Sequence, residues 1–179
     1  ARLLESCGHD IFRATYGSDV GLPVAKAIWG IKKLTEEYER VESANPRERA
    51  EFLGKAYAHG SKAYETDELS RKEIDDLNKR IYQRNDQDLP LLKKTAQWSI
   101  DYFETIYKKV GTKFDRMIWE SEVDALGKQI VEENIGKIFV KSDGAIIFPG
   151  EKYGLHNRVF INSVGNPTYE AKEMGLAKL

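Results

Sequence analysis

The stretch GHDIFRATYGSDVG, from Gly8 to Gly21, decides the fold class of this 179-residue chain. Asp10–Tyr16 has the pattern of a short strand with two apolar positions, and Gly17–Pro23 that of a polar, glycine-containing turn. Open α/β sheets bind ligands where such a strand ends, so Asp19 is expected at the edge of a ligand site. The stretch therefore predicts an α/β chain.

On its N-terminal side, Ala1–Cys7 is typical of the last turns of a helix that ends at Gly8. Cys7 is the only cysteine, which excludes an internal disulfide and favours a reducing, cytoplasmic setting. A reactive thiolate needs cationic neighbours or a helix N-terminus. We therefore expect Cys7 to be a small apolar filler.

On the C-terminal side, Pro23–Val110 is predicted to be almost wholly helical. Apolar residues recur at helical spacing as far as Val41, which predicts one long amphipathic helix. Asn45, with Glu48 three positions later, is typical of an N-cap and predicts a second helix. Gly60 is expected to end or loosen that helix.

Two further helices complete this block. Ser70 and Glu73 match the S-x-x-E capping box of the third helix, and Asp88 and Gly111 bound the fourth. The third helix is expected to carry a buried stripe and two ion pairs, namely Ile74, Leu77 and Ile81, with Asp75–Lys79 and Asp76–Arg80.

After the block, the pattern predicts a shorter helix, a β-hairpin turning at Ser142–Gly144, a further strand and a closing helix. Their expected bounds are Glu122–Glu133, Lys137–Val140 with Ala145–Phe148, Arg158–Ile161, and Thr168 onward.

Composition narrows the function. Charged residues make up 32% of the chain and hydrophobic ones 41%, the balance of a water-soluble globular protein. No apolar run is long enough to span a membrane, and no signal peptide is evident. A formal charge of −1 argues against a dedicated nucleic-acid module. The fourth helix combines aromatic and basic residues that would suit an RNA-facing surface, but core packing explains the aromatics better: Lys93, Lys94, Trp98, Tyr102, Lys108 and Lys109.

The sequence does not support a metal site, a catalytic triad or a phosphate-binding loop. His9, His59 and His156 lie far apart, and neither G-x-G-x-x-G nor a Walker sequence occurs. No catalytic residue and no metal ligand is assigned.

The segment NPTYEAKEMGLA, Asn166–Ala177, carries a second possible site. Tyr169 and Glu173 are four residues apart and share one helical face. An aromatic ring beside a carboxylate suits a guanidinium, which can stack on the ring and donate two parallel hydrogen bonds. Composition alone leaves an ordinary surface pair as the alternative.

Four segments in the same order and spacing resemble class I arginyl-tRNA synthetases: GHDIFRATYGSDVG, FDRMIWESE at Phe114–Glu122, the turn Asp143–Gly144, and GNPTYEAKEMGLAK at the end. The resemblance implies a predominantly helical fragment of a Rossmann-type catalytic domain with a small β-hairpin. Residues 1–44 would end the first Rossmann half, 45–135 would form a helical connective insertion, and 136–179 would re-enter the catalytic core.

The same resemblance places Tyr169 and Glu173 where the family reads the arginine side chain, although Glu173 stands where aspartate is usual. Tyr16, Asp19 and Gly21 would form the pocket edge. Asp19 and Gly21 match the family there, whereas Tyr16, Ser18 and Val20 replace its usual His, Gly and Trp, as in a divergent branch.

The family joins L-arginine to tRNA(Arg) through arginyl-adenylate, with ATP and magnesium. Its HIGH and KMSKS motifs do not occur in this sequence. We therefore expect a piece of a longer chain that is inactive alone, holds no cofactor, binds tRNA weakly or not at all and works in the cytoplasm. A non-catalytic helical interaction module derived from a synthetase, and a fragment of another class I synthetase, are the alternatives.

Overall fold

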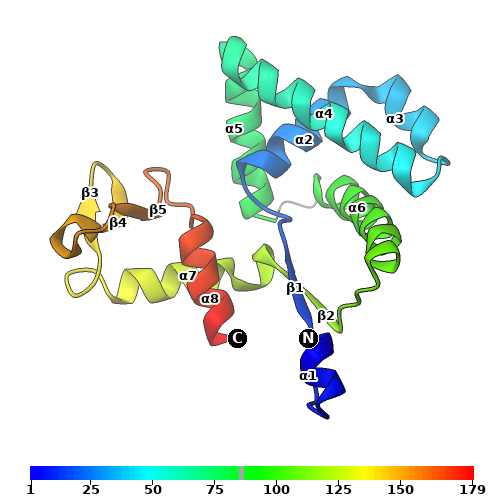
Figure 1. Cartoon of the computed structure of the whole chain (residues 1–179). Coiled ribbons are helices and arrows are strands. Elements are labelled where there is room, and N and C mark those ends of the chain that lie inside the picture. Colours follow the sequence, from blue (N-terminus) through cyan, green and yellow to red (C-terminus); the bar gives the residue numbers. More distant parts are fainter. Residues whose placement is uncertain (85–86) are drawn as a thin grey trace. The chain divides into compact units, whose positions relative to one another are not determined.

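The computed structural model describes residues 1–84 and 87–179, which form two compact units, Ala1–Ile118 and Trp119–Leu179. Figure 1 shows a mainly helical chain with short strands in both units. The helical character expected from the sequence is confirmed. The small sheets are β1-β2 in the first unit and β3-β4-β5 in the second.

The first unit begins with α1 and β1, continues through five helices and ends in β2. The bounds are α1 Arg2–Ser6, β1 Ala14–Gly17, α2 Leu22–Lys33, α3 Thr35–Val41, α4 Pro46–Thr66, α5 Glu68–Tyr82, α6 Leu89–Val110 and β2 Arg116–Trp119, whose last residue opens the second unit. The prediction of a nearly all-helical span from Pro23 to Val110 is confirmed for its described residues, which leave out 85–86.

The first strand is shorter than predicted. It starts at Ala14 rather than Asp10, and Phe12 is 71% exposed. Its pairing partner β2 is not predicted by the sequence pattern. The hydrogen bonds between the two segments begin at Arg13, whose carbonyl oxygen accepts from the backbone N–H of Asp115 at 2.7 Å. The strand begins where its hydrogen-bonding partner begins. Cys7, expected to be a filler, is exposed, because no residue of α1 is buried.

The single long helix predicted after the turn is wrong, because the chain breaks at Leu34 into α2 and α3. Leu34 has φ −110° and ψ 46°, and it packs partly buried against the core. The bend brings Tyr38 onto Trp98 with ring centroids 5.4 Å apart. Tertiary packing of an aromatic side chain thus outweighs helical continuity.

The cap of α4 is confirmed and that of α5 is corrected. The Asn45 side chain accepts from the N–H groups of Arg47 and Glu48, and Glu48 reaches back, which completes the box. Helix α5 starts two residues before the predicted Ser70. Asp67 is its N-cap and accepts from the Ser70 N–H at 2.7 Å.

The ion pairs predicted on α5 are also wrong. Asp76 binds Lys79 at 3.1 Å, and Asp75 accepts from Tyr64. Arg80 instead binds the buried Asp88 at 2.9 Å. Glu73, the other half of the supposed box, accepts from the Trp29 indole at 2.7 Å.

The core of the first unit joins α2, α4, α5 and α6. Gly60 does not end α4; it allows α2 to approach, since a Cβ there would lie 2.1 Å from the Lys26 carbonyl oxygen. Trp98 is buried in this core, as the packing interpretation of α6 requires. The predicted stripe of α5 is buried with it, namely Ile74, Leu77 and Ile81.

In the second unit, two helices pack on each other and on a three-stranded antiparallel sheet. The bounds are α7 Glu120–Glu133, β3 Val140–Ser142, β4 Ala145–Phe148, the 3-10 turn Gly150–Tyr153, β5 Arg158–Ile161 and α8 Tyr169–Lys178. The predicted hairpin is confirmed, with Asp143 and Gly144 both at positive φ in its turn. Its first strand is wrong, because β3 spans Val140–Ser142 instead of Lys137–Val140, and Ser142 belongs to the strand rather than to the turn. Its core centres on Val131, Phe139 and Ile161.

Candidate functional site

Tyr169 and Glu173 lie on the exposed side of α8, as their spacing predicts. Tyr169 is the first residue of the helix and is 54% exposed, and Glu173 is exposed one turn later. A hydrogen bond with the Glu173 carboxylate, followed by the charge of that carboxylate, raises the pKa of Tyr169. The two side chains thus form a solvent-facing unit that combines a ring and a carboxylate.

The start of α8 is fixed by the chain that precedes it. The hydroxyl of Thr168, the N-cap residue, donates to the carbonyl oxygens of Val159 and Phe160 in β5, at 2.7 and 3.1 Å. Tyr169 therefore follows directly from a segment that is hydrogen-bonded to the sheet.

Helix α8 also carries a buried ion pair that the sequence does not predict. The Lys172 ammonium lies 2.7 Å from the carboxylate of Glu120, the first residue of α7, and their side chains are 6% and 8% exposed. A buried pair of this kind fixes geometry, because either charge left alone in the interior is costly. Only the helical spacing of Lys172 from Ala171 and Gly175, which share the buried side, could have signalled its burial.

Tyr16, Asp19 and Gly21 lie in the first unit, around the turn between β1 and α2. Tyr16 is half-buried in β1. Gly21 is the N-cap of α2 with φ 107°, a conformation that other residues rarely adopt, so glycine is required for the turn.

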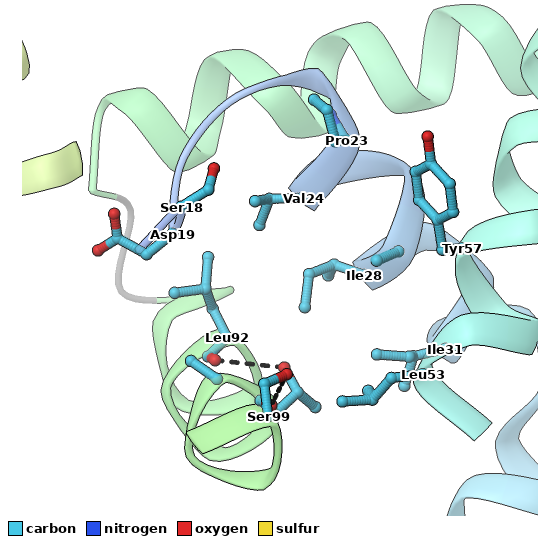
Figure 2. A pocket seen from close by; sticks show the side chains of 13 residues that line it. Ser18, Asp19, Pro23, Val24, Ile28, Ile31, Leu53, Tyr57, Leu92 and Ser99 are labelled. Atoms are coloured by element: carbon cyan, nitrogen blue, oxygen red, sulfur yellow. Dashed lines mark hydrogen bonds between the residues drawn. The ribbon is translucent and has the colours of Figure 1, made fainter. Parts of the chain in front are cut away.

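A cavity of about 290 Å³ opens beside this turn (Figure 2). Asp19 and Ser18 stand at one end and Tyr57 of α4 at the other, with Val24 and Ile28 of α2 between them. Tyr16 and Gly21 are not among the lining residues. The wall is mainly aliphatic, with further residues from α2, α4 and α6, so the cavity favours an apolar group and offers a cation only the carboxylate of Asp19 at its edge.

Metal chemistry gains no support from the described residues. No group of three or more His, Cys, Asp or Glu side chains among residues 1–84 and 87–179 could hold a metal ion. His59 stacks on Trp29 with ring centroids 5.6 Å apart, which gives it a packing role. In the same part of the chain, no helix has both the length and the apolarity needed to cross a membrane.

Comparison with known proteins points to one family. No family model matches the chain. It is 28% identical over 184 residues to the arginine–tRNA ligase of Borreliella afzelii, covering 98% of this chain and 31% of that protein. It is also 28% identical over 187 residues to the arginine–tRNA ligase of Bdellovibrio bacteriovorus, covering 99% and 31%. The chain therefore spans under a third of the length of these relatives.

Solved structures agree at the level of the fold. The arginyl-tRNA synthetase of Plasmodium falciparum superposes with a TM-score of 0.63 at 16% identity, covering 98% of this chain and 29% of that one. A putative arginyl-tRNA synthetase of Campylobacter jejuni gives 0.51 at 15% identity, covering 99% and 37%.

Proposed function

We propose that this chain, which is related along nearly its whole length to one part of arginyl-tRNA synthetases, supplies arginine recognition to an enzyme that joins arginine to its tRNA. The observation that carries the proposal is the pairing of Tyr169 and Glu173 on one exposed side of α8. A ring and a carboxylate that already meet need little rearrangement to receive a guanidinium.

In the proposed complex, the Glu173 carboxylate accepts two parallel N–H bonds from the guanidinium, while the ring of Tyr169 lies against its planar face. When no arginine is bound, the hydroxyl of Tyr169 occupies this carboxylate, and an incoming guanidinium takes its place. The buried pair of Lys172 with Glu120 keeps the first turn of α8 seated on α7. Recognition then rests on positioning, which is also how such a site accelerates the reaction of arginine with ATP.

The turn after β1 is assigned to the same enzyme. We place β1 at the end of the first half of a Rossmann-type domain, with Asp19 at the edge of the ligand crevice. The described residues offer no cluster suited to magnesium, so no step is assigned to a metal held by this chain. ATP, tRNA(Arg) and a cytoplasmic location belong to the proposed whole enzyme, and the chain alone is expected not to exchange pyrophosphate into ATP.

The proposal is tested by Glu173→Gln in the full-length protein. Loss of a charge-assisted pair should raise the Michaelis constant for arginine about 10- to 100-fold and leave that for ATP unchanged. Glu170→Gln is the matched control on the same helix, because Glu170 contacts Arg158 at 3.9 Å and lies outside the pair. An unchanged arginine constant for Glu173→Gln would identify the glutamate as an ordinary surface partner.

A second readout needs no catalysis. Because Glu173 raises the pKa of Tyr169, Glu173→Gln should lower the pKa of one tyrosine in an ultraviolet titration, and Tyr169→Phe should remove that transition. If no titration changes, the pair does not form in solution. Tyr169→Phe kinetics then separate a role of the ring, which gives a mild effect, from a role of the hydroxyl, which gives a severe one.

The flanking gene sequence distinguishes this function from that of a helical interaction module. An upstream HIGH motif and a downstream KMSKS-like loop would support the synthetase, whereas a native start and stop at these ends would support the module.

A further inference from the structure

The turn between β5 and α8, residues 162–168, is closed by its own hydrogen bonds (Figure 1). The side-chain oxygen of Asn162 accepts from the backbone N–H groups of Val164 and Asn166, at 3.2 and 2.9 Å. The Asn162 N–H donates to the carbonyl oxygen of Asn166 at 3.0 Å, and the Gly165 N–H donates to that of Asn162 at 2.9 Å. Asparagine side chains stabilise turns in this way, so the shape of this turn depends on Asn162.

A hydrogen bond from α7 reaches the same turn. The ammonium of Lys128 donates to the carbonyl oxygen of Gly165 at 2.9 Å. Lys128 follows Gly127, where α7 and α8 pack so closely that a Cβ would lie 2.0 Å from the Ala171 carbonyl oxygen. The lysine therefore extends from a fixed point of the helix crossing to the turn that precedes α8.

The first turn of α8 has no side-chain cap of its own. Thr168 is the N-cap residue, and a threonine there usually accepts from N–H groups of the first helical turn. Its hydroxyl makes no such bond and donates instead to the carbonyl oxygens of Val159 and Phe160 in β5. The position of Tyr169, the next residue, thus depends on the preceding turn.

An ordinary surface ion pair does not account for Lys128. Its ammonium lies 3.9 Å from the carboxylate of Glu132, one turn further along α7, and the two side chains are 39% and 51% exposed. An exposed pair at this distance contributes little. The shorter bond to the Gly165 carbonyl oxygen is the contact that joins two elements.

We propose that Lys128 and Asn162 are positioning residues for arginine, which fix the turn before α8 so that Tyr169 stays beside Glu173. Both act through Tyr169 rather than on the ligand. The identity of the ligand rests on the proposed function, whereas the link between the turn and the Tyr169–Glu173 pair rests on the hydrogen bonds described above.

The first test is steady-state kinetics of Lys128→Met in the full-length protein. The Michaelis constant for arginine should rise about 3- to 10-fold, while kcat and the constant for ATP stay unchanged, because only the binding of arginine is impaired. Lys128→Arg keeps a charged donor and should restore the constant. A purely structural role would give a different result: less folded enzyme lowers the apparent kcat and leaves both Michaelis constants as they were.

Asn162 supplies a second pair of variants. Asn162→Ala removes the acceptor of two backbone N–H groups and should raise the arginine constant as Lys128→Met does. Asn162→Asp keeps an oxygen at that position and should behave as the unchanged protein.

Two controls lie close to Lys128. Lys141→Met makes the same substitution at an exposed position of β3, beside the same hollow that Lys128 and Gly165 line. Glu132→Gln removes the ion pair of Lys128 and keeps its hydrogen bond to Gly165. Both should leave the arginine constant unchanged.

The second test follows Tyr169 directly and needs no arginine. Fluorine NMR of full-length protein labelled with 3-fluorotyrosine monitors the titration of Tyr169, whose signal is the one that Tyr169→Phe removes. The hydrogen bond with Glu173 raises the pKa of Tyr169. Lys128→Met and Asn162→Ala should lower that pKa, because a displaced Tyr169 loses the bond, and Lys128→Arg should restore it.

The proposal is overturned if Lys128→Met leaves the Tyr169 titration unchanged, or if Lys141→Met or Glu132→Gln shifts it equally. It is also overturned if Glu173→Gln raises the arginine constant and Lys128→Met does not. If Glu173→Gln has no effect on arginine, the proposed function fails, and the titration still decides whether the turn positions Tyr169. The two failures therefore give different results.

Discussion

Two helix crossings, α2 with α4 and α7 with α8, are built on the same backbone device in different surroundings. In the first, a Cβ on Gly30 would lie 2.0 Å from the carbonyl oxygen of Ala56, and a Cβ on Gly60 would lie 2.1 Å from that of Lys26. Each glycine stands four residues after the carbonyl that faces the other glycine, so the contact is reciprocal.

The second crossing repeats this arrangement. A Cβ on Gly127 would lie 2.0 Å from the carbonyl oxygen of Ala171, and a Cβ on Gly175 would lie 2.3 Å from that of Val123. The four-residue offset is the same. Small residues that let helix backbones meet also allow Cα–H···O contacts between them.

The surroundings differ. The α2–α4 crossing continues into a wide apolar core that includes Ile28, Phe52 and Trp98, whereas α7 and α8 are joined at one end by the buried Glu120–Lys172 pair. The shared device sets how closely the helices pack. The surroundings decide which further feature depends on that packing. In the first unit it is the large apolar core, and in the second it is the position of Tyr169.

Breaking either crossing should have the largest effect. Gly30→Ala and Gly127→Ala each place a methyl group inside the distance that a carbonyl oxygen allows, so the helices must separate, at a cost of about 3 kcal/mol or more in unfolding free energy. Urea unfolding measured by circular dichroism and tryptophan fluorescence assigns the loss, because Trp29 and Trp98 report on the first unit and Trp119 on the second.

Gly54→Ala is the matched control. Gly54 is an exposed residue inside α4 with nothing within 4 Å of its added Cβ, so the same substitution should stabilise by roughly 0.5–1 kcal/mol. Equal losses at Gly54 and Gly30 would mean that close approach is not what these glycines provide.

The next prediction concerns the buried Glu120–Lys172 pair, which is present at the α7–α8 crossing and not at the α2–α4 crossing. Lys172→Met leaves the Glu120 carboxylate buried without its cation, which should cost about 3–5 kcal/mol. Adding Glu120→Gln removes the stranded charge and should recover part of this loss, with a coupling of about 0.5–3 kcal/mol between the sites. Urea midpoints of the two single variants and the double variant measure the coupling. Strict additivity would show that the pair does not act as a unit.

The sequence predicts what local periodicity controls. The stripe of α5, the Asn45 cap and the hairpin turn at Asp143 and Gly144 all follow from spacing within one element. The break at Leu34 does not, because it depends on Tyr38 meeting Trp98 from a helix far along the chain.

Two competing N-cap residues explain why the predicted start of α5 is wrong. Asp67 and Ser70 are both suitable N-caps, and the structure uses Asp67 because Glu73 is taken by the Trp29 indole. In the candidate site, too, local spacing predicts one feature and contacts with another helix decide the other. The shared side of Tyr169 and Glu173 follows from their spacing, whereas the burial of Lys172 depends on α7, which the pattern of α8 does not contain.

The smallest effect concerns pH and the buried carboxylate of the first unit. Asp88 is 2% exposed and accepts from Lys32 at 2.5 Å and from Arg80 at 2.9 Å. Burial favours the neutral acid, but the two hydrogen-bonded cations together outweigh it and hold the pKa of Asp88 below its usual value. The native state therefore binds this proton less readily than the unfolded chain does.

A depressed native pKa gives stability that is fully present above the unfolded pKa, about 4, and is lost as pH falls through the native value. Asp88→Asn should thus lower unfolding free energy by about 1–3 kcal/mol at pH 7, with a difference from the unchanged chain that shrinks below pH 4. Asp76→Asn, whose carboxylate meets Lys79 in an exposed pair, should show little difference at any pH. Urea midpoints measured from pH 7 to pH 3 decide the matter: a constant difference for Asp88→Asn would mean that lost packing, rather than the charge held by Lys32 and Arg80, accounts for the destabilisation.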